Sequence, residues 1–406
     1  MPAQAQIADP HAGRPARVAQ LRPNPFAQVT VHRDDAGRPV ELRIWCVTKS
    51  RGAVTRNFVA GREPEFERIC RVVTDAAAAK PLADLVLLAA FGLWASEDDL
   101  IAPVRLCAPL APCRETNAAP LSLDTLVVRG ETWLQHGAAP PAHLAGIPLG
   151  CLDAARPILW HRGAAHEPTL PWWPSAECVA ALAALQAGAA PRAEFAAALR
   201  ALAAQDIVAP ASAAGAGATA GAARDQGGDF FARHGYAAMP GILPPAQIAA
   251  WRDYWQRLAA LEVLPDRGDA GARRGSHGEP SSALLLQLMQ PLVEAVVGAA
   301  LKPSYSYAWI YRRGAAMPLH RDREACRATV SVLVDYAPAM DGPTPWPLGI
   351  HPRGGGAPVE IRQALGDAVV FSGRELDHFR PPFTAGTRST SLLLHYVDRD
   401  FSGVLI

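Results

Sequence analysis

Apolar and polar residues alternate in two segments near the start of the chain, residues 28–32 and 40–47. This alternation is typical of half-buried strands, and the Asp- and Gly-containing segment 34–37 between them predicts a tight turn. The first part of the chain is therefore expected to form a β-hairpin. Apolar residues then recur at helical spacing over 63–79, and the apolar run 82–96 predicts a second helix.

A faint internal repeat follows this pattern. Residues 81–100 combine Pro, an apolar helical stretch and an acidic turn, and residues 174–195 repeat the same order. The second copy ends in a predicted helix that runs into a short strand at 207–208. Short helices closed by a strand outline a winged helix. A mixed α/β domain without that relationship explains the same pattern and remains the favoured interpretation.

The second half of the chain has a different pattern. A helix that begins with proline is predicted over 244–258, and a second over 284–297, where Pro291 is expected to break or kink it. Short apolar strands separated by Gly and Pro follow, and they favour a sandwich or barrel. These strands are residues 305–311, 328–334, 366–371 and 389–397.

Composition narrows the class of protein. The 406 residues are 50% hydrophobic, which excludes global disorder, and the net charge of +1 argues against a dedicated nucleic-acid binder. The apolar run 82–95 is shorter than the roughly 20 residues of a membrane span and is interpreted as a buried helix. Seven scattered cysteines without a CxxC motif, and no signal-like apolar segment in 1–25, predict a cytoplasmic protein.

The same pattern predicts the division of the chain into domains. Residues 1–25 are expected to be a disordered tail, and residues 26–209 a separate mixed α/β domain. Residues 210–226 consist almost entirely of Ala, Gly and other small residues, which predicts a flexible linker. Residues 227–406 form the second domain, which carries the candidate chemistry.

Candidate metal ligands lie among the predicted strands. His320 and Asp322 are two residues apart, so at the end of a strand both side chains point to one face. His378 lies 58 positions after His320, just beyond the predicted strand 366–371. Two imidazoles and one carboxylate on one side of a metal are typical of Fe(II) sites that leave positions open for a chelating cosubstrate and O2. Arg388 and Thr390 share a face of the next strand and offer a guanidinium and a hydroxyl for a carboxylate.

Other polar residues near these motifs have two interpretations each. The arginines that flank the candidate ligands are either solvated or paired, or they present positive charge to an acidic substrate; they are Arg321, Arg323, Arg327, Arg374 and Arg380. His395 lies in an apolar strand, where a hydrogen-bonded core histidine is favoured over a ligand. Cys326 is interpreted as a small core residue.

Taken together, these motifs resemble those of the Fe(II)/2-oxoglutarate-dependent dioxygenases, in particular the prolyl-hydroxylase-like branch. The resemblance covers about residues 227–406 and rests on Tyr311–Gly314, the HxD pair, His378 and residues 386–390. It implies an α+β fold in which a double-stranded β-helix, or jelly roll, carries flanking helices. It also implies that His320, Asp322 and His378 ligate iron, and that Arg388 binds the distal carboxylate of 2-oxoglutarate with help from Thr390 and Tyr311.

The resemblance leaves several functions open. Because Asp322 is present, hydroxylation or another oxidation with Fe(II), 2-oxoglutarate and O2 is favoured over halogenation. A peptide substrate held by residues 26–209 is one hypothesis, since a tethered binding module raises the effective concentration of a weak substrate. The alternatives are a hydroxylase of a small molecule or amino acid and a non-catalytic 2-oxoglutarate or metal sensor. No membrane or nucleic-acid partner is predicted, and the sequence leaves the oligomeric state open.

Overall fold

The computed structural model describes residues 21–405 except for 35, 76–79, 111–124, 138, 146, 148, 191, 212–226 and 268–271. Two compact units, Met1–Pro103 and Val104–Ile406, make up the chain. The boundary between them lies within residues 26–209, whereas the sequence predicts it at 210–226. Residues 104–210 group with the C-terminal half, where the Gln247 side chain donates to the carbonyl of Pro171. Nearly all of the predicted linker lies outside the described residues.

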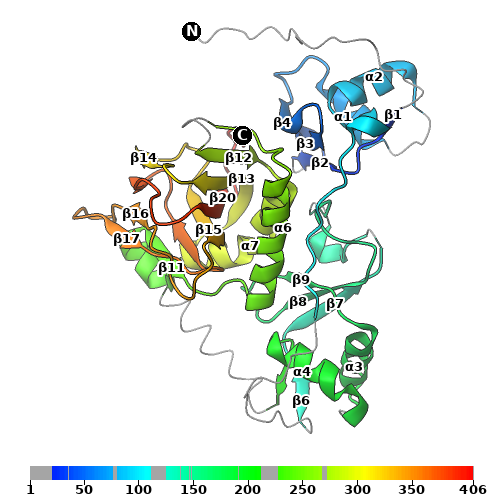
Figure 1. Cartoon of the computed structure of the whole chain (residues 1–406), viewed down its shortest axis with the longest axis vertical. Coiled ribbons are helices and arrows are strands. Elements are labelled where there is room, and N and C mark those ends of the chain that lie inside the picture. Colours follow the sequence, from blue (N-terminus) through cyan, green and yellow to red (C-terminus); the bar gives the residue numbers. More distant parts are fainter. Residues whose placement is uncertain are drawn as a thin grey trace. The chain divides into compact units, whose positions relative to one another are not determined.

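In its described residues, the first unit contains two small antiparallel sheets and the helices α1 and α2 (Figure 1). One sheet has the order β2–β3–β4, and the other pairs β1 with β5. Helix α1 packs its buried Phe66, Ile69 and Cys70 against Leu42 and Ile44 of the sheet. The elements are β1 (Leu21–Pro23), β2 (Ala27–Arg33), β3 (Pro39–Thr48), β4 (Gly52–Val59), α1 (Phe66–Thr74), α2 (Leu82–Ala90), β5 (Trp94–Ser96) and the 3-10 turn η2 (Glu97–Asp99).

The predicted hairpin is confirmed, because β2 and β3 pair antiparallel around the turn at Gly37. Two other expectations need correction. Strand β1 shows that the end of the predicted disordered tail is ordered, and residues 1–20 lie outside the described part. The helix predicted over 82–96 ends at Ala90, because Gly92 has a φ of +74° and the next residues form β5, which pairs with β1.

Residues 104–210 form a second mixed region within the larger unit. Strands β7, β8 and β9 make an antiparallel sheet, and β10 pairs with β6 after the two short helices α3 and α4. The predicted helices and closing strand of this segment are therefore present. The elements are β6 (Leu126–Val128), β7 (Glu131–Gln135), η3 (Ala142–Leu144), β8 (Ile158–Arg162), β9 (Leu170–Trp172), α3 (Ala176–Gln186), η4 (Ala193–Phe195), α4 (Ala196–Ala204) and β10 (Val208–Pro210).

The remaining strands form two facing antiparallel sheets (Figure 1). The larger sheet has the order β11–β18–β15–β20–β13–β12, and the smaller has the order β14–β19–β16–β17. This interleaved order is that of a double-stranded β-helix, as expected. The elements are β11 (Tyr236–Met239), α6 (Pro245–Ala260), β12 (Arg273–His277), α7 (Pro280–Val297), β13 (Leu301–Arg312), β14 (Met317–His320), β15 (Ala328–Ala337), β16 (Leu348–Ile350), β17 (Val359–Ile361), β18 (Ala368–Phe371), β19 (His378–Arg380) and β20 (Arg388–Asp398).

The two faces of the larger sheet have different surroundings. On the inner face, residues from both sheets pack together, for example Val369 and Phe371 with Leu348 and Ile350. Helices α6 and α7 cover the outer face (Figure 1). Because successive side chains alternate between faces, one residue of shift decides whether a side chain points into the barrel or toward the helices.

Helix α7 continues through Pro291 and is not broken there. It is long and apolar enough, by length and composition alone, to cross a membrane, but 61% of that stretch is buried inside the protein. The hydroxyl of Tyr396, on β20, donates to the carbonyl of Leu286 in the middle of the helix. Packing against the sheet therefore accounts for the apolar composition of α7.

Candidate metal centre

Two neighbouring strands of the smaller sheet bring the predicted ligands together. His320 ends β14 and is paired in register with His378, the first residue of β19. Asp322 follows β14, and its Oδ1 lies 3.8 Å from Nε2 of His320 and 3.7 Å from Nε2 of His378. One ligand atom from each residue lies within 4.8 Å of the others. The three side chains thus form a compact group of two imidazoles and one carboxylate.

Both imidazoles have one nitrogen held by the backbone. Nδ1 of His320 lies 2.8 Å from the carbonyl oxygen of Pro318, and Nδ1 of His378 lies 3.1 Å from that of Leu376. A carbonyl only accepts, so each Nδ1 donates a proton and each Nε2 keeps a lone pair for a metal. Burial lowers the pKa of His378, which favours the neutral, ligating form.

The group is open on one side. The His320 side chain is 40% exposed, Asp322 14% and His378 only 3%. The His378 ring lies against Phe371, with centroids 4.7 Å apart. A metal held here would therefore be enclosed from the barrel side and accessible to other ligands from the side of His320. This donor set suits Fe(II) with positions open for a cosubstrate and O2.

The carboxylate of Asp322 is held by the larger sheet. Thr329 Oγ1, on β15, donates to Asp322 Oδ2 at 2.6 Å and also lies 3.1 Å from Nδ1 of His395. Gly373 lies directly against this contact, since a Cβ there would be 2.3 Å from Asp322 Oδ2. His395 is thus a hydrogen-bonded core histidine, as favoured from the sequence, and burial lowers its pKa to about 4.

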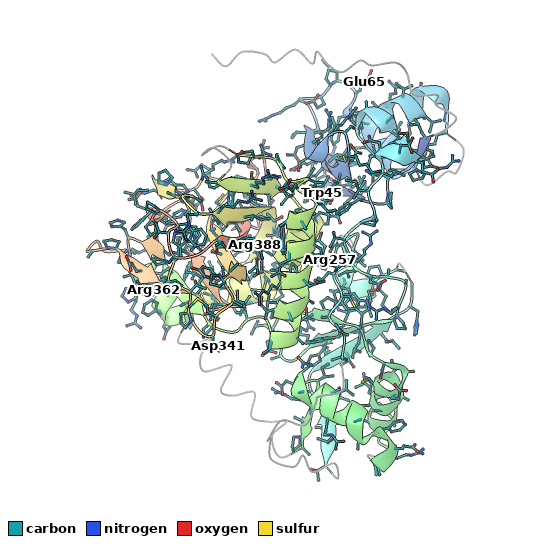
Figure 2. The ribbon with its side chains drawn as sticks, in the orientation of Figure 1. Trp45, Glu65, Arg257, Asp341, Arg362 and Arg388 are labelled. Carbon is teal, nitrogen blue, oxygen red and sulfur yellow. The ribbon has the colours of Figure 1, made fainter. Side chains whose placement is uncertain are left out.

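Arg388 and Thr390 do not lie on the same side of the sheet as this group. Arg388 Nε donates to Asp335 Oδ2 at 2.6 Å, and Asp335 also accepts from Arg252 and Gln256 of α6. Thr390 is paired in register with Asp335, so it shares that outer face. The positions of Arg388 and Thr390 therefore do not support their predicted role inside the barrel. Arg388 is labelled in Figure 2.

A different arginine points into the barrel. Arg380 lies two residues after His378 on β19, on the same face of the strand. Its side chain reaches the inner face of the larger sheet, where it donates to Ser331 Oγ at 3.3 Å and to Gln363 Oε1 at 3.2 Å. Its guanidinium carbon lies 4.8 Å from the centre of the Trp346 ring.

Arg380 has no carboxylate partner among the described residues, although it is buried. Burial lowers its pKa, but a guanidinium stays protonated in proteins, so a cation is held inside the barrel by neutral groups alone. Removing a charge from water without an opposite charge is costly. An anion beside Arg380 would offset that cost.

Further polar groups on the inner face support such an anion. The hydroxyls of Ser389 and Ser391 are buried without a hydrogen-bond partner. Both residues lie on β20 in register with inward-facing Tyr311 and Trp309 of β13. The sequence-predicted Tyr311 is buried beside Arg380, and burial raises its pKa to about 12. One cation and several hydroxyls thus lie on the inner face of the barrel, and Arg380 is only two residues from the ligand His378; these donors suit the carboxylate of an anionic ligand.

In the sequence, Arg380 is only one of several arginines that flank the candidate ligands, and its two interpretations there are equally open. The i, i+2 spacing from His378 is the signal that could have identified it, because it places both side chains on one face of a strand. The choice between Arg380 and Arg388 depends on which face of β20 turns inward, and the sequence of β20 does not specify that.

Comparison with known proteins gives structural matches only. No protein-family model and no curated protein matches the chain. Among solved structures, the 2-oxoglutarate-dependent epimerase SnoN from nogalamycin biosynthesis is 16% identical and covers 44% of this chain and 83% of its own, with a TM-score of 0.38. AviO1 from Streptomyces viridochromogenes is 22% identical over 45% and 97%, with a TM-score of 0.37. A prolyl-4-hydroxylase from Pseudomonas putida is 19% identical over 43% and 99%, with a TM-score of 0.35.

Proposed function

We propose that this chain is an Fe(II)/2-oxoglutarate-dependent oxygenase that hydroxylates an unactivated C–H bond. The observation that carries the proposal is that β19 places a metal ligand and a buried cation side by side on one face. His378 belongs to a two-histidine, one-carboxylate group, and Arg380 is a buried cation two residues farther along the same face. A keto diacid that chelates a metal needs both features: the metal-ligand group for its keto-acid end and the cation for its distal carboxylate.

Each residue has a defined task in this proposal. His320, Asp322 and His378 hold Fe(II), and the backbone carbonyls bonded to the two Nδ1 atoms fix the ring orientations. Arg380 binds the distal carboxylate of 2-oxoglutarate, with the hydroxyls of Ser389 and Ser391 as further donors. When bound, the iron and the keto acid supply the oxidation of a C–H bond by O2, which protein side chains cannot perform.

The rest of the barrel positions the substrate. Because His320 lies on the open side of the ligand group, the substrate approaches from that side and places its C–H bond near the metal. The buried His378 and Phe371 close the opposite side and exclude water from it.

Anaerobic titration with Fe(II) and 2-oxoglutarate tests the site. The wild-type protein should develop the visible metal-to-ligand charge-transfer band of the chelate, and His320→Ala should not. Arg380→Gln should need at least about tenfold more 2-oxoglutarate to develop the band, the loss expected for a charge-assisted pair. Arg388→Gln is the matched control and should titrate like the wild type.

The outcomes separate the alternatives. A folded wild-type protein without a band would rule out the iron-chelate site. A large effect of Arg388→Gln with none of Arg380→Gln would instead restore the role that the sequence resemblance implies for Arg388. A charge-transfer band without succinate formation, across peptides and small molecules, would favour the sensor alternative.

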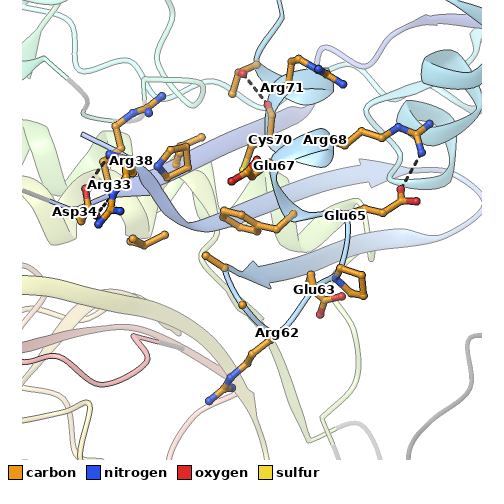
Figure 3. A pocket seen from close by; sticks show the side chains of 18 residues that line it. Arg33, Asp34, Arg38, Arg62, Glu63, Glu65, Glu67, Arg68, Cys70 and Arg71 are labelled. Carbon is orange, nitrogen blue, oxygen red and sulfur yellow. Dashed lines mark hydrogen bonds and ion pairs between the residues drawn. The ribbon is translucent and has the colours of Figure 1, made fainter. Parts of the chain in front are cut away.

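For the substrate, the proposal is a peptide bound by the N-terminal part of the chain, which would raise the effective concentration of a weakly bound substrate. Support comes from an open groove of about 1250 Å³ in the first unit (Figure 3). The groove lies between the β2–β3 hairpin and the start of α1, and β2 is an edge strand of its sheet. An extended peptide can pair with such an edge and place side chains in the groove.

Charged side chains line this groove. Arg38 is paired with Asp34 and Arg68 with Glu65, as Figure 3 shows, whereas Arg62, which also lines the groove, has no carboxylate partner among the described residues. Paired charges on the rim contribute little to affinity but set specificity and register.

Peptide stimulation of succinate formation tests the substrate proposal. A peptide substrate should stimulate turnover more than the free amino acids that compose it, and Arg62→Glu should raise the KM for the peptide while leaving kcat nearly unchanged. Arg22→Glu, on the exposed part of β1 outside the groove, is the control. Stimulation by a small metabolite alone, with no effect of Arg62→Glu, would identify the protein as a small-molecule hydroxylase.

A further inference from the structure

Several arginines lie close to the metal-ligand group, and most of them are paired with carboxylates. Arg321 donates to both oxygens of Asp377, at 2.9 and 3.0 Å. Arg327 and Arg374 both lie at Asp398, and Arg374 also lies 3.9 Å from Glu324. These pairs account for the positive charge of the three arginines, so they present little of it to a substrate.

Arg323 differs from these neighbours. It is exposed, directly follows Asp322 and has no carboxylate partner among the described residues. Its guanidinium carbon lies 5.7 Å from the centre of the Tyr305 ring. An aromatic face orients a guanidinium but does not neutralise its charge. The Arg323 side chain is therefore a cation that remains available to an incoming ligand.

The ring beneath Arg323 is connected to the metal-ligand group. Tyr305 packs on His395 with ring centroids 4.3 Å apart, and His395 contacts the same Thr329 hydroxyl that donates to Asp322. The Tyr305 hydroxyl also lies 3.1 Å from the thiol of Cys326. Arg323 therefore lies beside the metal-ligand group rather than on a remote surface.

A row of aromatic residues continues from Tyr305 along the inner face of β13. Tyr307 and Trp309 are half-buried, with ring centroids 4.6 Å apart, and the guanidinium carbon of Arg273 lies 5.3 Å from the Trp309 ring. Burial raises the pKa of Tyr307, and the charges of Arg267, Arg273 and Arg323 oppose this rise. The aromatic row thus lies in a positive field.

We propose that this surface selects a substrate that carries a carboxylate near the carbon to be oxidised, with Arg323 as its partner. The proposal rests on the proposed function and names the chemistry of its substrate. A guanidinium can bind a carboxylate through two parallel hydrogen bonds, and the half-buried rings beside it reduce the screening by water. The carboxylate belongs either to an acidic residue of a peptide or to a free organic acid.

Paramagnetic relaxation measures this selection without turnover. The full-length protein is loaded with Mn(II) and saturating 2-oxoglutarate, and the relaxation of probe protons is followed by NMR. The probes are the capped tripeptides Gly-Asp-Gly and Gly-Glu-Gly, their Asn and Gln counterparts, and free N-acetylaspartate. The acidic probes should bind at least about tenfold more tightly than their neutral counterparts, and this preference should be lost in Arg323→Gln.

Arg374→Gln is the matched control, because it removes a nearby arginine that is already paired with a carboxylate. It should keep the preference for acidic probes to within about twofold. Equal binding of acidic and neutral probes by the loaded wild-type protein, or equal losses in Arg323→Gln and Arg374→Gln, would overturn the inference. Binding of the free acid but not of the tripeptides would identify a small-molecule source for the carboxylate.

Mn(II) binding is recorded first by electron paramagnetic resonance. A protein that binds no Mn(II) would overturn the proposed function, and this inference with it. A protein that binds Mn(II) and 2-oxoglutarate but does not prefer acidic probes would overturn only the inference about Arg323.

Discussion

Thr329 Oγ1 donates to Asp322 Oδ2 at 2.6 Å, which joins the larger sheet of the barrel to a candidate ligand that follows the smaller sheet. The bond occupies one carboxylate oxygen, and the other, Oδ1, faces the Nε2 atoms of His320 and His378. The orientation of the carboxylate is thus set by a residue that does not itself belong to the ligand group.

Replacing Thr329 should therefore weaken metal binding. Thr329→Val keeps the shape of the side chain but removes the hydroxyl, and loss of such a supporting hydrogen bond typically reduces metal affinity by about 10- to 100-fold. Titration with Mn(II) followed by electron paramagnetic resonance measures the change. Thr329→Ser should restore most of the affinity, whereas equal affinities of the Val and Ser variants would contradict a positioning role.

Gly373 provides a second test of the same contact. A Cβ at this position would lie 2.3 Å from Asp322 Oδ2 and 2.4 Å from Thr329 Oγ1. We expect Gly373→Ala to displace the carboxylate and to lower metal affinity at least as much as Thr329→Val. Gly228→Ala, where the nearest atom is 3.7 Å away, is the control and should bind metal normally.

Asp335 should matter for stability rather than for cosubstrate binding. Its side chain is almost completely buried and accepts hydrogen bonds from Arg252, Gln256 and Arg388. Asp335→Ala leaves these donors without their common acceptor, and removing one member of a buried charge pair costs roughly 3–5 kcal/mol. Urea denaturation should show the loss, while the 2-oxoglutarate titration of the folded variant stays unchanged. Weaker 2-oxoglutarate binding at full stability would contradict the placement of this pair outside the barrel.

The protein should lose stability in mild acid through its buried histidines. Burial lowers the pKa of His161, in β8, to about 4 from 6.5. Between these two pH values the unfolded chain binds a proton that the folded chain does not, so the free energy of unfolding falls as the pH falls. At roughly 1.4 kcal/mol per unit, one such histidine contributes on the order of 3 kcal/mol of pH dependence.

Urea denaturation at pH 7, 6 and 5 checks this expectation. The wild-type free energy of unfolding should decrease with falling pH, and His161→Gln should show a shallower decrease. The same slope in both proteins would show that His161 does not bind the extra proton on unfolding.

Local sequence patterns predicted much of the architecture. The hairpin of β2 and β3 follows from alternation around turn residues, and α6 follows from a proline start and an apolar stripe. Helix α2 is shorter than its pattern suggested, because Gly92 and the pairing of β5 with β1 end it. Pairing of β5 with a strand about 70 residues away cannot be read from the local sequence pattern.

The sequence alone determined the kind of chemistry, since His320 and Asp322 at i, i+2 and His378 after a buried strand already specify a two-histidine, one-carboxylate group. Tertiary structure decided which cation faces that group. The register of β20 turns Arg388 toward α6 and Asp335, while the position of β19 buries Arg380 inside the barrel. The physical reason is the period of two in a strand: a shift of one residue exchanges the two faces, and only long-range pairing fixes the register.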